Sequence, residues 1–138
     1  MRRILFTAFL FCFIQTYAKT PIPEALLNAK TAVVINEGAE GKDFEKFCKL
    51  LREWGRFELV QTRGGADIVI KLSVQLQTRT VRLPNTGGGF GGMTNQQVIV
   101  SYMRIFKTED DTQLWTDEIP AKDPKNLVTN LKNKLKDK

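Results

Sequence analysis

The clearest pattern in the sequence is an alternation of apolar and polar side chains over residues 66–76. Every second position is apolar from Ile68 to Leu76, and the positions between them include Lys71, Ser73 and Gln75. Successive side chains of a β-strand point to opposite faces, so a period of two predicts a strand with one buried face. We expect the rest of the chain to pack on this strand or to pair beside it.

Four other segments have the length and composition of strands: residues 31–35, 57–61, 97–106 and 113–119. The segment 97–106 is unusual because it has apolar residues at both parities, and with 113–119 it is expected to form an antiparallel hairpin. After Gln77 the apolar positions change phase, since Val81 and Leu83 take the parity that Lys71 and Ser73 hold earlier. This shift predicts a bulge or a protruding arm.

Two segments have the spacing of amphipathic helices. The first has Asp43 as its expected N-cap and Gly55 as its stop, and its apolar stripe is Phe44, Phe47, Cys48, Leu51 and Trp54. The second follows Asp123 and Pro124, with an apolar stripe of Leu127, Val128, Leu131 and Leu135. We expect Cys48 to be buried with the first stripe.

The order of these elements predicts an α+β fold, a two-layer sandwich in which two helices cover one face of a mainly antiparallel sheet of about five strands. Residues 31–138 are expected to form a single domain, preceded by an extended leader at 19–30 and containing a glycine-rich hairpin loop at 84–95. A phosphate-binding loop would require a helix directly after the glycines. The pattern leads into another strand instead, so we expect a plain loop.

The first 18 residues have the composition of a secretory signal peptide. Arg2 and Arg3 precede an apolar run at residues 4–14, and small residues at Thr16 and Ala18 suit a signal peptidase. The run is too short to span a membrane, and the large residues before Cys12 do not suit lipidation. We therefore expect cleavage after Ala18 and a periplasmic or secreted protein.

Composition narrows the chemistry further. Cleavage leaves 120 residues with a net charge of +4, one cysteine and no histidine, so no internal disulfide forms and the side chain most used in acid–base catalysis is missing. No metal-binding cluster is evident, and the acidic run 109–111 lacks the spacing of a calcium loop. We expect no enzyme, no cofactor, no metal and, at this modest charge, no nucleic-acid partner.

Several short segments resemble the amino-terminal domain of TolB and the related envelope domains of CsgG- and LpoB-type proteins. They are residues 33–35, 54–60, 66–70, 102–105 and 114–117, and the resemblance covers about residues 31–135. Those families place a glycine in the turn before the Leu-Trp pair, where this chain has Asp110 and Asp111. The resemblance implies a periplasmic adaptor or binding domain, and these families share no catalytic residues.

Two helices can cover only one face of a sheet, so one apolar set of residues 97–106 should remain exposed as an interface. We expect Tyr102 and Arg104, flanked by Lys71, Ser73 and Gln75, to bind an envelope protein there, unless self-association or the leader covers this face. The alternative is binding of an anionic membrane surface through the lysines of the carboxy-terminal helix, Lys125, Lys132, Lys134, Lys136 and Lys138.

Overall fold

The computed structural model describes residues 21–84 and 91–136. The predicted signal peptide, residues 85–90 of the glycine-rich segment, and Lys138 lie outside this range. The described residues form five strands and three α-helices: α1 (Glu24–Asn28), β1 (Thr31–Glu37), α2 (Gly41–Trp54), β2 (Glu58–Val60), β3 (Ile68–Arg82), β4 (Met93–Lys107), β5 (Gln113–Ile119) and α3 (Lys125–Lys136).

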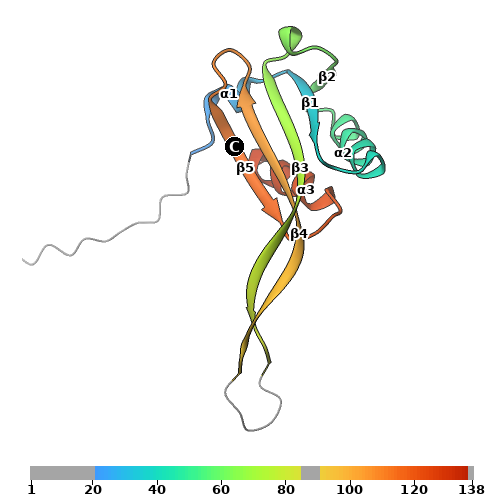
Figure 1. The fold of residues 1–138 in the computed structure, drawn as a ribbon. Coiled ribbons are helices and arrows are strands. Elements are labelled where there is room, and N and C mark those ends of the chain that lie inside the picture. Colours follow the sequence, from blue (N-terminus) through green and yellow to red (C-terminus); the bar gives the residue numbers. More distant parts are fainter. Residues whose placement is uncertain (1–20, 85–90, 137–138) are drawn as a thin grey trace, which may run out of the picture.

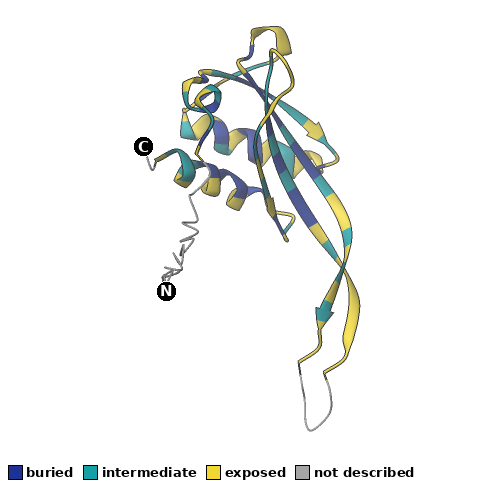
Figure 2. Ribbon diagram, turned by 90° about the vertical axis from the view of Figure 1, so that its left-hand side faces the viewer, coloured by how far each residue is buried: buried dark blue, intermediate teal, exposed yellow. Residues whose placement is uncertain are grey.

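The strands form one sheet in the order β2-β1-β3-β4-β5 (Figure 1). Strand β1 runs parallel to both β2 and β3. Helix α2 is the crossover connection between β1 and β2, which returns the chain in the same direction. Strand β4 is antiparallel to β3 and β5, and these two pairs contain most of the paired residues. Figure 2 shows α2 and α3 on the same side of the sheet. The predicted α+β sandwich is confirmed, with a mixed sheet.

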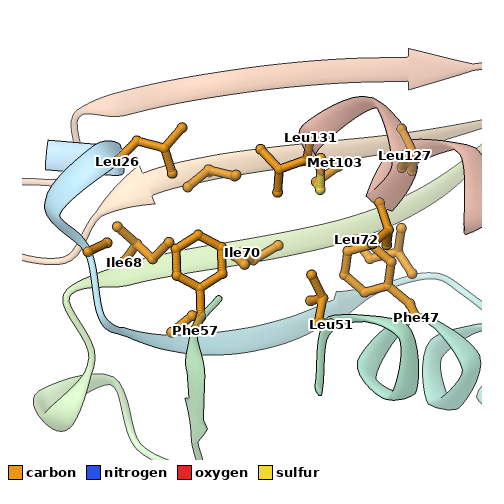
Figure 3. Close-up of a cluster of buried hydrophobic side chains, with 14 of the residues drawn as sticks. Leu26, Phe47, Leu51, Phe57, Ile68, Ile70, Leu72, Met103, Leu127 and Leu131 are labelled. Carbon is orange, nitrogen blue, oxygen red and sulfur yellow. The ribbon is translucent and has the colours of Figure 1, made fainter. Parts of the chain in front are cut away.

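The main core lies between the sheet and the two long helices (Figure 3). The alternating apolar residues of β3 form the sheet side of this core, and the apolar stripes of α2 and α3 pack on them. Its fully buried side chains include Ile68, Ile70, Leu72, Met103, Phe47, Leu51, Leu127 and Leu131. Burying a side chain of this size stabilises the fold by about 1.5–3 kcal/mol, so the alternation at residues 66–76 is the pattern around which the domain packs.

The ends of the helices are set by local chemistry. Helix α2 ends at Gly55, whose φ of 69° is left-handed, as its sequence position predicts. Its beginning differs from the prediction, because Glu40 is the N-cap and Asp43 lies inside the first turn. At α3, the carboxylate of Asp123 accepts a hydrogen bond of 2.9 Å from the backbone N–H of Lys125, in agreement with the expected cap.

The leader packs into the core. Part of it is the short helix α1, and Ile22, Leu26 and Ala29 are buried in the main cluster. Its end is held by the Asp67 carboxylate, which accepts the backbone N–H groups of Lys30 and Thr31 at 2.8 and 3.0 Å. These two hydrogen bonds keep the pKa of Asp67 below its ordinary value.

Strands β3 and β4 pair without interruption from Ile68↔Lys107 to Arg82↔Met93. Their outer halves extend beyond both long helices as a two-stranded arm (Figures 1 and 2). The predicted protruding arm is thus confirmed, but the bulge after Gln77 is wrong. The apolar pattern changes there because the helices no longer cover the sheet, whereas the register is unchanged. The expected loop is also shorter, since β4 already begins at Met93.

The turn between β4 and β5 contains an aspartate in the left-handed region. Asp111 adopts a φ of 56°, and aspartate tolerates this left-handed conformation better than most side chains. The Asp111 carboxylate also forms an ion pair with the Arg63 guanidinium. The turn therefore closes without glycine.

Candidate functional site

The residues predicted to bind a partner lie together on the sheet face that α2 and α3 leave open. Strand register places Lys71 of β3 opposite Arg104 of β4, and Ser73 opposite Tyr102. Gln75 lies one step farther along this face, opposite Val100. A residue that the sequence did not indicate joins them, because the parallel pairing of β1 places Glu37 opposite Ser73.

The centre of this site is an ion cluster in which one carboxylate holds two cations. Glu37 Oε1 lies 3.0 Å from Lys71 Nζ, and Glu37 Oε2 lies 2.7 Å from the guanidinium of Arg104. The hydrogen bond from Lys71 and the charges of both cations hold the pKa of Glu37 below its ordinary value of 4.5. All three side chains are about a third exposed. The cluster carries a net charge of +1 at a surface that a partner can reach.

Two polar atoms within the site have no hydrogen-bond partner in the described part of the chain. They are the Ser73 hydroxyl and the Arg104 Nε, and both atoms are buried. Ser73 as a whole is only 2% exposed. A buried polar atom without a partner costs about 1–3 kcal/mol, so hydrogen-bonding capacity is left over beside the cluster. The guanidinium N–H can only donate, and it therefore requires an acceptor.

Aromatic side chains flank the cluster on both sides. Lys71 Nζ lies 5.2 Å from the centroid of the Phe106 ring, which fits a cation–π contact. The Gln77 side-chain amide donates a hydrogen bond to the Tyr102 hydroxyl. Both rings are half-buried. The site is thus an ordered polar surface bordered by aromatic rings.

The predicted exposed apolar patch on this face is wrong. Val33, Val69 and Val100 are buried there, and Ile35, Val60 and Phe106 pack around a small second cluster. Long charged side chains can pack their aliphatic parts on apolar surface and keep their charges in water, and the ammonium of Lys71 lies over the ring of Phe106. In residues 21–84 and 91–136, the large apolar side chains that remain exposed all belong to the arm and its end: Leu76, Leu83, Met93 and Ile99.

Two lysines of the second candidate surface, on α3, contact aromatic rings. Lys132 Nζ lies 5.8 Å from the ring of Trp54, and Lys134 Nζ lies 5.3 Å from the ring of Trp115. Trp115, which pairs with the buried Ile105, therefore lies on the helix side of the sheet. Lys125 and Lys136 are exposed at opposite ends of α3. The lysines thus differ in environment and do not form one uniform basic face.

Cys48 is buried in α2 as expected, and burial raises the pKa of its thiol. Over residues 21–84 and 91–136, no three side chains of His, Cys, Asp or Glu are grouped so that they could hold a metal ion. In the same residues, no helix is long and apolar enough to cross a membrane.

The fold and this site define a small α+β domain with a charged, uncovered sheet face. No protein-family model matches the sequence, and no curated protein is similar to it. Among solved structures, that of lipoprotein GNA1162 from Neisseria meningitidis is similar with a TM-score of 0.40 and 11% identity, over 79% of this chain and 99% of that chain. A likeness of this size does not establish a shared function. The resemblance to TolB-, CsgG- and LpoB-type domains stays a prediction.

Proposed function

We propose that the protein is a non-catalytic binding domain exported to the cell envelope, and that it contacts a protein partner through the helix-free face of its sheet. The observation that carries this proposal is the cluster of Glu37, Lys71 and Arg104, which has a net positive charge and which α2 and α3 leave uncovered. Export is supported by the signal-peptide pattern of residues 1–18.

The chemistry of the cluster indicates what the partner presents. Two cations share one carboxylate, which leaves a net charge of +1 on side chains that are about a third exposed. A carboxylate on the partner would balance this charge and accept hydrogen bonds from the two cations. Glu37 already holds the Arg104 side chain in place, so less side-chain entropy is lost on binding. Tyr102 and Arg104 are also residue types that often dominate the energy of interfaces.

The proposal is tested by affinity capture from the cell envelope followed by mass spectrometry. Tyr102→Ala and Arg104→Ala, made separately, should each reduce partner recovery by about tenfold or more, since truncation of an interface anchor costs about 2 kcal/mol or more. The melting temperature should change by only a few degrees. Arg63→Ala is the matched control, because it breaks an exposed ion pair with Asp111 outside this face.

Undiminished capture by both variants would overturn the proposal, and loss of the fold in either would assign that residue to structural support. Co-sedimentation with vesicles of anionic lipid distinguishes the alternative function. Binding that disappears in Lys125→Gln/Lys136→Gln but persists in Arg104→Ala would favour membrane contact through α3. The protein-binding proposal is preferred because Lys132 and Lys134 already contact indole rings.

A further inference from the structure

The outer half of the arm has backbone edges without a neighbouring strand in the described residues. Pairing of β3 with β1 ends at Ser73, and pairing of β4 with β5 ends at Ser101. Beyond these points β3 and β4 pair only with each other, as far as Arg82 and Met93 (Figure 1). A two-stranded hairpin is at best marginally stable in water, whereas three or more strands support one another.

Hydrogen bonds at the two ends of the arm show which backbone groups point outward. The N–H of Thr108 donates to the carbonyl of Asp67 at 3.1 Å, and the N–H of Leu83 donates to the carbonyl of Gly92 at 2.9 Å. Because the register between them is unbroken, the even-numbered residues of β4 bond to β3 and the odd-numbered ones face the other edge. Beyond Ser101, the outward groups belong to Met93, Asn95, Gln97 and Ile99.

The two edges differ in charge. The outer part of β4, residues 93–101, contains no charged residue and no proline, whereas the outer part of β3 carries Arg79 and Arg82. Natural sheets usually protect a long edge with charges, prolines or bulges. The β4 edge lacks all three, and a β-rich, uncharged segment of this kind pairs readily with an identical one. Nearby apolar side chains are also unusually exposed: Met93 by 70%, Leu76 by 62% and Ile99 by 41%.

We propose that residues 93–99 of β4 pair antiparallel with the same residues of a second copy of the chain. The twofold axis would lie normal to the sheet, so each face of one arm continues into the same face of the other. The two arms would then form a four-stranded sheet with the order β3-β4-β4′-β3′. Pairing through β3 is less favourable because that edge carries Arg82 and also Arg79, which forms an ion pair with Glu118. This interface is independent of the proposed partner site.

Sedimentation velocity on protein purified after expression of the full chain tests the proposal. The wild type should show a dimer whose fraction rises with concentration. Gln97→Pro removes an N–H from the proposed interface without removing a hydrogen bond between β3 and β4. It should weaken dimerisation by about tenfold or more, because the twofold symmetry removes two backbone hydrogen bonds, one from each copy.

Thr78→Pro is the matched control, because Thr78 is the cross-strand partner of Gln97 and its N–H faces the opposite edge. The dissociation constant of its dimer should stay within about twofold of the wild-type value. A wild type that is monomeric at every concentration, equal weakening by both prolines, or a dimer unaffected by Gln97→Pro would each overturn the proposal. If Gln97→Pro fails to fold, Asn95→Lys/Gln97→Lys charges the same edge and must weaken the dimer.

Discussion

Glu37 shows how a functional surface can depend on a residue that the sequence does not single out. It follows an apolar run and precedes Gly38, so it has the appearance of a turn residue. In the structure β1 continues through Glu37, and its carboxylate joins Lys71 to Arg104. Lys71 and Arg104 are both far from Glu37 in the sequence, and only strand pairing brings the three charges together.

Replacing Glu37 should change how stability depends on pH. The pKa of Glu37 is lowered in the folded state, so its contribution is present above the ordinary value of 4.5 and is lost as the pH falls through the folded pKa. Glu37→Gln should therefore cost up to about 1 kcal/mol at neutral pH, after screening by solvent. The difference from the wild type should shrink in strongly acidic solution. Urea unfolding at neutral and acidic pH measures both values, and a constant difference would show that the ion cluster does not act through this charge.

At the scale of elements, the leader departs most from what its sequence suggests. Pro21 and Pro23 predict an extended segment, and the residues after them predict a single helical turn that packs only lightly. The leader nevertheless places Leu26 in the core, fully buried among side chains of the sheet and helices (Figure 3). The arm differs from the leader in being exposed, because its two strands continue beyond the part of the sheet that α2 and α3 cover.

The buried leader gives a direct stability prediction. Leu26→Ala should lower the free energy of unfolding by about 2–5 kcal/mol, because it removes a fully buried side chain and leaves a cavity. Leu27→Ala is the comparison on the next position of α1, where the side chain is only half-buried, and it should cost clearly less. Urea denaturation of the two variants measures the difference. Equal, small losses would show that the leader does not contribute to the core.

The whole molecule divides into a packed body and an exposed arm (Figure 2). The two core clusters contain residues of the leader, the helices and the inner halves of the strands. Val74 is the last residue of β3 that belongs to either cluster, and Met103 is the first residue of β4 that does. We therefore expect the body to fold without the arm, and the arm to serve association.

Removal of the arm tests this division. Residues 78–97 can be replaced by Asn-Gly, because Gln77 and Val98 are direct cross-strand partners and a two-residue turn of this type suits a hairpin. The melting temperature should stay within a few degrees of the wild-type value, measured at a concentration at which the wild type is monomeric. Cooperative unfolding monitored by circular dichroism is the measurement. Loss of the folded state would show that the arm is part of the body.

The sequence by itself determined the local elements. The period-two run of β3, the apolar stripe of α2 with its stop at Gly55, and the cap of α3 at Asp123 were all predicted and are all present. Each depends on a spacing of a few residues, which backbone geometry converts directly into a strand, a helix or a helix end. The α+β class followed from the order of these elements.

Only the tertiary structure decided what the open face presents. The sequence placed Tyr102 and Arg104 on one strand and Lys71 on another, but the β1–β3 register added Glu37 and so produced the ion cluster. The expected apolar patch is absent from that face because its valines are buried and the larger apolar side chains pack around them in a second cluster. Pairing between distant strands fixes such neighbours, and single-strand periodicity contains no information on which residue of another strand lies opposite.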